Sequence, residues 1–277
     1  MSKRKSSVAS DRTATLVCVP KRLPPHLWAK AARKAVQREP RNAAPLYRLG
    51  RVVPGLDLNH LNHEALTVVV DRKWPTTGVR FTVSFLDSPE AALRTRIISH
   101  MNAWNQTANV RFVETAKEGQ VRIARETGKN GGYWSFLGSE IDEIPMDQQT
   151  MNLEGFTMKT RDSEFHRVVR HETGHTLGFP HEHMRKELVN KIDRQKAIKY
   201  YGDTQGWNKA EVIRQVLTPL EESSLLETGH ADPNSIMCYQ IPGFLTKDGK
   251  PILGGTDIDP EDYAFAAKIY PKSVKVV

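Results

Sequence analysis

The architecture of this chain can be predicted from one segment, His171-Glu172-Thr173-Gly174-His175-Thr176-Leu177-Gly178-Phe179-Pro180-His181. His171 and His175 lie four residues apart, so a helix would place both imidazoles on one face. Their nitrogens could then reach one Zn²⁺ at about 2.0–2.1 Å. Gly178 can adopt a positive φ, which allows the chain to turn and to bring back His181 as a third ligand. Three protein ligands leave one position for water, as in a catalytic zinc site.

Glu172 follows the first histidine directly. It lies about 100° around the helix, too far round to be a ligand but near enough to contact a water on the metal. A bare H-E-x-x-H also occurs by chance or on the surface of an ordinary amphipathic helix. The correctly spaced Gly178 and His181 favour the metal site over that interpretation.

A second motif lies about 55 residues after His181 and reads Ser235-Ile236-Met237-Cys238-Tyr239. A zinc-binding segment followed by a methionine-containing turn is typical of metzincins. Met237 alone would be interpreted as a core residue, because methionine fills irregular apolar gaps. Under three imidazoles it is expected to form an apolar floor.

The chain resembles the astacin family of metzincin endopeptidases. The resemblance rests on the zinc-binding segment, on its continuation His181-Glu182-His183-Met184-Arg185 and on the methionine turn. It extends through Trp74, residues 110–113 and Gly132-Tyr133-Trp134-Ser135-Phe136-Leu137-Gly138, and covers residues 65–271.

The resemblance implies an α+β fold with two subdomains. A twisted mixed sheet with two long helices forms the upper half, the lower half is loop-rich, and zinc lies in the cleft. It implies one catalytic Zn²⁺ on His171, His175 and His181, with Glu172 as the general base for a metal-activated water. Tyr239 would be a further ligand at rest that later stabilises the oxyanion.

Three further roles follow from the same resemblance. Tyr133, Trp134, Ser135 and Phe136 are expected to form the strand that pairs with extended substrate. Glu182 is expected to anchor the N-terminus of the matured enzyme. A pro-segment aspartate commonly occupies the water position, and Asp57 in Gly55-Leu56-Asp57 is a candidate, although the expected preceding aromatic residue is absent.

The cysteines depart from the family pattern. Astacins normally have four that form two disulfides, whereas this chain has only Cys18 and Cys238. We expect both to be free thiols, because Cys18 falls in a predicted tail. A zinc role for Cys238 is not expected, since its side chain should point away from that of Tyr239 in an extended turn.

The N-terminal region carries most of the net charge of +8. Residues 1–51 hold 13 Lys or Arg and two acids, net +11, whereas the remainder holds 27 basic and 30 acidic residues, net −3. We interpret residues 1–64 as a solvated basic extension, a candidate pro-segment, and residues 65–277 as the catalytic domain. Residues 27–37 could form an amphipathic helix. The alternative for this tail is binding to nucleic acid or another anionic surface.

Periodicity predicts the other elements. Residues 66–70, 79–85, 110–113 and 121–124 alternate as strands. Residues 89–106 should form a helix that buries Ala92, Ile97, Ile98, Met101 and Trp104.

Two helix starts carry capping signals. Asp162 or Ser163 should cap the zinc-binding helix, and Asp259 should cap a last helix ending at Ile269. The C-terminal part of the chain is expected to be more irregular until Asp259.

These features predict a zinc endopeptidase that acts on protein or peptide substrates as a monomer. No apolar run is long enough to span a bilayer, and nucleic-acid binding is not expected. No signal peptide is evident and the few cysteines fit a cytoplasmic protein, although the family is usually secreted. The rival hypothesis is a pseudo-enzyme that holds zinc and binds peptides without cutting them, against which the intact Glu172 argues.

Overall fold

The computed structural model describes residues 18, 21–45, 47, 70–219 and 231–272. Its centre is a five-stranded sheet in the order β2-β1-β3-β5-β4. The strands are β1 (Val79–Phe85), β2 (Val110–Glu114), β3 (Val121–Ala124), β4 (Tyr133–Ser135) and β5 (Met151–Leu153). Only the β4–β5 pair is antiparallel. The predictions for β1, β2 and β3 are confirmed, and residues 66–69 lie outside the described part.

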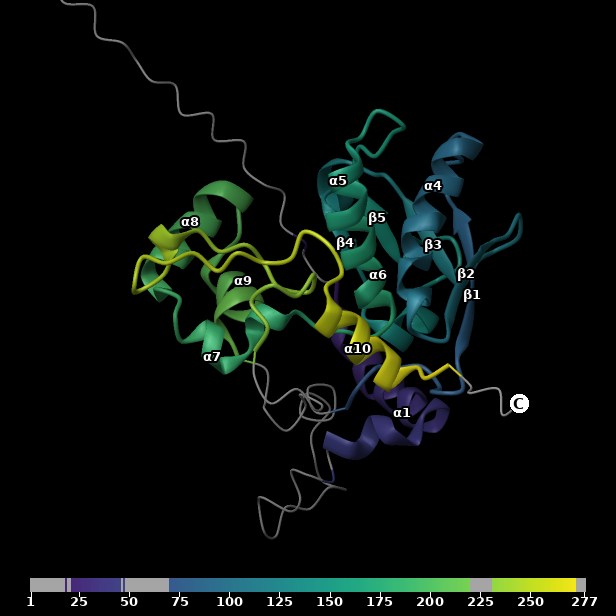
Figure 1. Ribbon diagram of the computed structural model, residues 1–277, viewed down its shortest axis with the longest axis horizontal. Helices are drawn as coiled ribbons and strands as arrows, with labels where there is room; N and C mark the ends of the chain where they lie inside the picture. The colour runs from purple at the N-terminus through teal and green to yellow at the C-terminus, as the bar shows by residue number, and fades with distance from the viewer. Residues whose placement is uncertain (1–17, 19–20, 46, 48–69, 220–230, 273–277) are drawn as a thin grey trace, which may run out of the picture.

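Two long helical segments pack on this sheet (Figure 1). One is α4 (Ala91–Met101), continued by the 3₁₀ turn Asn102–Gln106. The other runs from α5 (Asp162–Glu164) through the π-helical turn Phe165–Val169 into α6 (Arg170–Thr176). The inner face of α4 holds Leu93, Ile97 and Met101, whereas Ala92 is exposed and Ile98 half-buried. The prediction for Ala92 was wrong because the buried stripe passes through Leu93.

The expected cap of the zinc-binding helix is also absent. Asp162 is the first residue of α5 and, like Ser163, makes no capping hydrogen bond. Its carboxylate instead accepts from the Arg96 guanidinium at 3.0 Å, which ties the start of this helix to α4.

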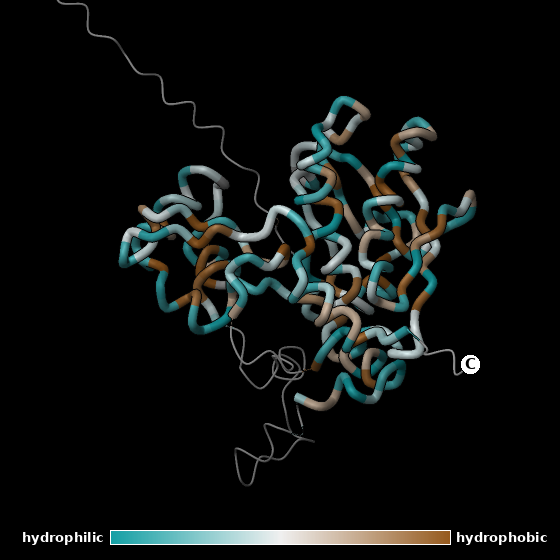
Figure 2. Tube along the Cα trace, in the orientation of Figure 1, coloured by the Kyte–Doolittle hydropathy of each residue, from teal (hydrophilic) through white to brown (hydrophobic). Residues whose placement is uncertain are grey.

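The lower half contains more helix than the sequence predicted. It holds α7 (Lys186–Val189), α8 (Arg194–Gln205) and α9 (Lys209–Val212), followed by the π-helical turn Ile213–Leu217. These elements group on one side of the molecule in Figure 1, around a hydrophobic cluster of their own. Figure 2 shows apolar segments inside both halves. The last helix, α10 (Pro260–Ile269), lies between the halves and begins with the predicted Asp259 cap.

Residues 21–45 pack against the domain and are not a solvated tail. They form a 3₁₀ turn (Pro25–Leu27), α1 (Trp28–Arg38) and a second 3₁₀ turn (Pro40–Ala43). Leu23 and Ala31 are buried in the main core. The part of the chain that the structure describes contains no helix able to cross a membrane.

Candidate metal centre

Helix α6 and the turn after it bring the three predicted histidines together. His171 and His175 project from α6, which ends where Phe179 N–H donates to the Gly174 carbonyl at 3.0 Å. Gly178 has φ +91°, the conformation for which glycine was predicted. The Nε2 atom of His181 then lies 3.1 Å from that of His171 and 2.9 Å from that of His175.

The hydrogen bonds of these histidines orient their free ring nitrogens for metal binding. The Nδ1–H groups of His171 and His175 donate to the carbonyls of Ile236 (2.6 Å) and Phe179 (2.8 Å). Their Nε2 atoms therefore carry lone pairs that point at one centre, and the carbonyls fix the ring orientation. Ligands of a tetrahedral zinc are about 3.3 Å apart. Burial lowers the pKa of His171 to about 4, so it is neutral near pH 7, the form that binds metal.

Glu172 lies beside the trio and is buried. Among the described residues its carboxylate has no polar partner apart from the neighbouring Cys18 thiol. Burial raises the pKa of Glu172 to about 8, against the opposing effects of the Cys18 thiol and Arg167. A carboxylate with a pKa near neutral is suited to accept and return a proton.

The methionine turn (Ser235–Tyr239) lies against α6 as expected. A Cβ on Gly174 would come within 2.4 Å of the Met237 sulfur, so the turn packs directly on the zinc-binding helix. The turn is held by Asp262 of α10, whose carboxylate accepts from Ser235 Oγ (2.6 Å) and Ile236 N (2.8 Å). Asp262 is an acid in the first turn of α10, and no local sequence signal predicts its contact with the methionine turn.

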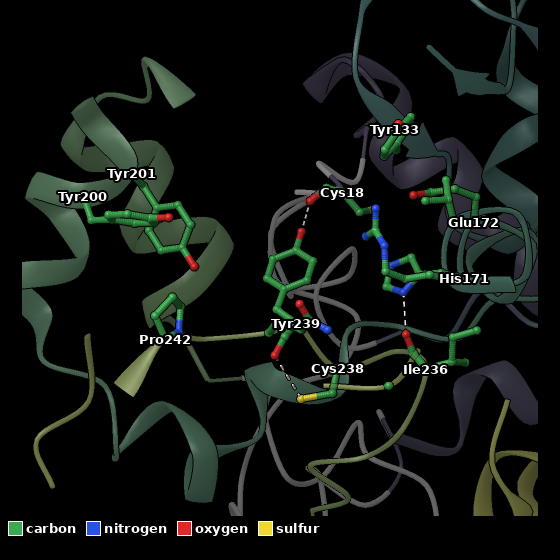
Figure 3. Close-up of a pocket in the computed structure, with 14 residues that line it drawn as sticks. Cys18, Tyr133, His171, Glu172, Tyr200, Tyr201, Ile236, Cys238, Tyr239 and Pro242 are labelled. Carbon is green, nitrogen blue, oxygen red and sulfur yellow. Dashed lines mark hydrogen bonds between the residues drawn. The ribbon is translucent and has the colours of Figure 1, made fainter. Parts of the chain in front are cut away.

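Tyr239 lies at the edge of the trio, with its ring centroid 4.2 Å from that of His181. Tyr239 also stacks on His183, with the ring centroids 4.0 Å apart and the planes 15° from parallel. His183 is fully buried. The Tyr239 hydroxyl donates to the main-chain carbonyl of Cys18 (Figure 3).

The position of Cys18 is the main correction to the sequence-based view. Cys18 and Cys238 are both free thiols, as predicted, but Cys18 is buried at the metal centre. Its sulfur and one ligand nitrogen from each of the three histidines all lie within 4.8 Å of one another. Cys238 is not part of this group, and its sulfur donates to the Tyr239 carbonyl away from the trio (Figure 3).

A cavity of about 120 Å³ lies beside the trio, with Cys18, Tyr133, Glu172 and Tyr239 among the residues that line it. Tyr133, Trp134 and Ser135 form β4, and Phe136 follows it; β4 is the last strand at one edge of the sheet. Of the predicted substrate residues Tyr133 faces this cavity, whereas Trp134, Ser135 and Phe136 are buried.

Glu182 occupies a separate site on the other side of the methionine turn. Its main-chain N–H donates to the Met237 carbonyl at 2.9 Å, and its carboxylate accepts from Asp232 N at 3.2 Å and pairs with Arg185. The side chain lines a cavity of about 80 Å³. Burial raises the pKa of Glu182 to about 7, against the opposing charge of Arg185. Asp57 lies outside the described residues.

A helix with H-E-x-x-H, a third histidine after a glycine turn and a methionine turn below define a metzincin-type site. The family model of the Astacin peptidases matches residues 67–253 of the chain. The chain belongs to this family.

Individual relatives agree with this assignment. The chain is 29% identical over 252 residues to the dorsal-ventral patterning protein tolloid of Drosophila melanogaster, covering 87% of this chain and 19% of that protein. It is 26% identical over 232 residues to zinc metalloproteinase nas-27 of Caenorhabditis elegans, covering 84% and 50%. The chain thus spans half or less of these curated relatives. A solved structure of myroilysin superposes with a TM-score of 0.68 at 29% identity, covering 73% of this chain and 97% of that one.

Proposed function

We propose that this protein is a zinc-dependent endopeptidase with a single catalytic ion on His171, His175 and His181, and that its substrates are proteins or peptides. The supporting observation is the convergence of the three Nε2 atoms, 3.1 and 2.9 Å apart, beside the buried Glu172. Membership of a peptidase family supports the reaction class.

The chemistry follows from the side chains around the trio. Zinc, when bound, supplies a Lewis acid that activates water and polarises the scissile carbonyl. Glu172 accepts the proton of the attacking water and then delivers it to the leaving amine. Tyr239 donates its hydroxyl proton in a hydrogen bond to the developing oxyanion, a contribution of about 3–4 kcal/mol for a well-placed donor. For this step the Tyr239 hydroxyl must leave the Cys18 carbonyl.

The N-terminal extension is removed on activation in this proposal, with the catalytic domain starting near Ala65. The cavity beside Glu182 would then receive the new terminal amine. Asp71, Glu182, Asp232 and Asp262 line that cavity, so it is acidic and lies next to the start of the domain. Partly buried carboxylates are suitable partners for an ammonium group, provided that the charges are paired.

Zinc analysis and cleavage of a quenched fluorescent peptide test this function. Both are measured for the full-length chain and for Cys18→Ser, because Cys18 lies beside the three imidazoles. In either background Glu172→Gln should retain zinc and lose activity by about 10²–10⁴-fold, the range of general acid–base catalysis. His175→Ala should lose both.

His166→Ala is the matched control. His166 lies on the same helical segment but belongs to a separate group with His100 and Asp162, so its removal should preserve zinc at the His171 site. Cleavage that persists in chelator-treated Glu172→Gln protein would refute the catalytic assignment.

A further inference from the structure

The sulfur of Cys18 lies within 4.8 Å of a ligand nitrogen of each of the three histidines. We propose that the Cys18 thiolate completes the coordination of the zinc held by His171, His175 and His181, and that Cys18 with residues 21–45 forms an inhibitory segment that keeps the enzyme latent. This inference rests on the proposed zinc site. It adds a protein ligand and a mode of regulation to that site.

The donor set supports this assignment. The Cys18 sulfur belongs to one group with the three imidazoles, whose ligand atoms all lie within 4.8 Å of one another, and all four side chains are buried. Thiolate and imidazole are ordinary zinc ligands, and four protein ligands close a site that three leave open for catalysis. In the exchange, a zinc–sulfur bond replaces a zinc–water bond and the thiol proton passes to solvent. A metal cation deprotonates a coordinating thiol even where burial disfavours the thiolate.

Cys18 also engages the catalytic tyrosine. Its main-chain carbonyl accepts the hydroxyl hydrogen of Tyr239, the group assigned to the oxyanion (Figure 3). Cys18 therefore binds the metal through its sulfur and accepts the hydrogen bond of the neighbouring Tyr239 through its carbonyl. A substrate carbonyl would need the same two partners, so Cys18 and substrate exclude one another.

The residues after Cys18 cover the substrate strand. Lys21 forms a parallel β-bridge with Phe136, and its ammonium lies 4.8 Å from the centroid of the Trp134 ring. Leu23 is buried in the main core, and its carbonyl accepts from Trp28 Nε1 at 2.6 Å. The inhibitory segment therefore lies along the sheet edge predicted to bind an extended peptide.

Helix α1 fastens this segment to the catalytic domain. The Lys30 ammonium lies 2.7 Å from the Glu143 carboxylate, and Lys34 pairs with the same carboxylate. Arg38 pairs with Asp142. Both acids belong to the 3₁₀ helix Gly138–Glu143, which comes shortly after β4. The inhibitory segment is thus attached to the catalytic domain at two places. Cys18 binds the zinc at one end, and the ion pairs of α1 hold the other end.

Cobalt substitution separates this inference from the proposed function. Full-length protein, Cys18→Ser and Cys238→Ser are loaded with Co²⁺, and the near-ultraviolet sulfur-to-cobalt charge-transfer band is recorded together with the bound metal. Cys238→Ser is the matched control, because Cys238 is an equally buried thiol outside the ligand group. The full-length protein and Cys238→Ser should show the band, and Cys18→Ser should bind cobalt without it.

Two spectroscopic outcomes oppose this result in different ways. Stoichiometric cobalt in the full-length protein without a thiolate band would overturn the role of Cys18 and leave the proposed zinc site intact. Absence of bound cobalt and of bound zinc from both the full-length protein and Cys18→Ser would overturn the proposed function as well.

Latency is tested by peptide cleavage with the zinc-loaded proteins. A tethered ligand acts at a high effective concentration, so Cys18→Ser should cleave the peptide about 10²-fold faster than the full-length protein, or more. Equal rates for these two proteins would overturn the inhibitory role even if the charge-transfer band is present.

Discussion

The zinc-binding helix and the inhibitory segment meet at one cleft, but their positions have different physical origins. His171 and His175 converge because helix geometry places residues four apart on one face, and Gly178 turns His181 towards them. Cys18 reaches the same centre from the far end of the chain, through contacts with β4 and with the 3₁₀ helix that includes Glu143. A local pattern determines the first region, and packing between distant residues determines the second.

Metal removal should produce the largest change in stability. Loss of a ligand present at about 1,000 times its dissociation constant costs about 4 kcal/mol, which corresponds to a fall in Tm of about 8–16 °C for a domain of this size. Thermal unfolding with and without chelator measures this effect. The fall should be smaller in Cys18→Ser, which has one ligand fewer, and unchanged in His166→Ala. A Tm that chelator leaves unaltered would contradict the metal site.

Asp262→Ala should have the next largest effect, because it removes the support of the methionine turn. Asp262 accepts from Ser235 Oγ and Ile236 N, and each buried donor left without a partner costs about 1–3 kcal/mol. The Ile236 carbonyl in turn orients His171, so zinc affinity should fall together with stability. Urea unfolding and zinc titration would check this. Unchanged zinc affinity would mean that the turn does not depend on Asp262 for its position.

Much of the metal centre could be predicted from sequence because its signals are local. The spacing of the three histidines, the glycine turn and Glu172 lie within one segment, and their arrangement in the structure agrees with the prediction. The Asp259 cap was also predicted, since an N-cap followed by proline is a short-range signal. The role of Asp262 could not be predicted, because its contact with the methionine turn joins residues that are distant in the sequence.

Other elements lacked an adequate local signal. Strand β5 has three residues, too few for periodicity to reveal. Helix α8 is the exception, because local signals mark both of its ends, the Asp193 cap and Gly206 at φ 68°. Cys18 carries no spacing relation to the histidines, so nothing in its neighbourhood distinguished it from a thiol in a solvated tail. Only the packing of residues 21–45 places it at the centre.

Gly174→Ala probes the packing of the zinc-binding helix on the methionine turn. Alanine normally favours a helix over glycine by about 1 kcal/mol. Here its Cβ would come within 2.4 Å of the Met237 sulfur, and overpacking costs about 1–3 kcal/mol. We therefore expect a net loss of stability in urea unfolding.

Gly202→Ala on α8 is the control for that substitution. The nearest neighbour of its Cβ would be the Trp207 carbonyl oxygen at 3.5 Å, an ordinary contact. This variant should gain up to about 1 kcal/mol from helix propensity. A similar gain in Gly174→Ala would show that Met237 can move away without cost. The packing below the imidazoles would then tolerate an added methyl group.

Lys30→Gln with Lys34→Gln should have the smallest effect on global stability and should act on the inhibitory segment alone. Burial disfavours the Glu143 carboxylate, but the two ammonium groups hold its pKa below the ordinary value. Both lysine side chains are about half exposed, which limits each ion pair to roughly 1 kcal/mol or less. Weaker attachment of α1 should nevertheless expose Cys18 more often. Alkylation of Cys18 by iodoacetamide, measured by mass spectrometry, should therefore be several-fold faster.

Lys199→Gln, which removes an exposed pair with Asp203 on α8, should leave that rate unchanged. Equal alkylation rates in all three proteins would show that the hold on Cys18 comes from the metal and the β4 edge, with α1 contributing nothing to it.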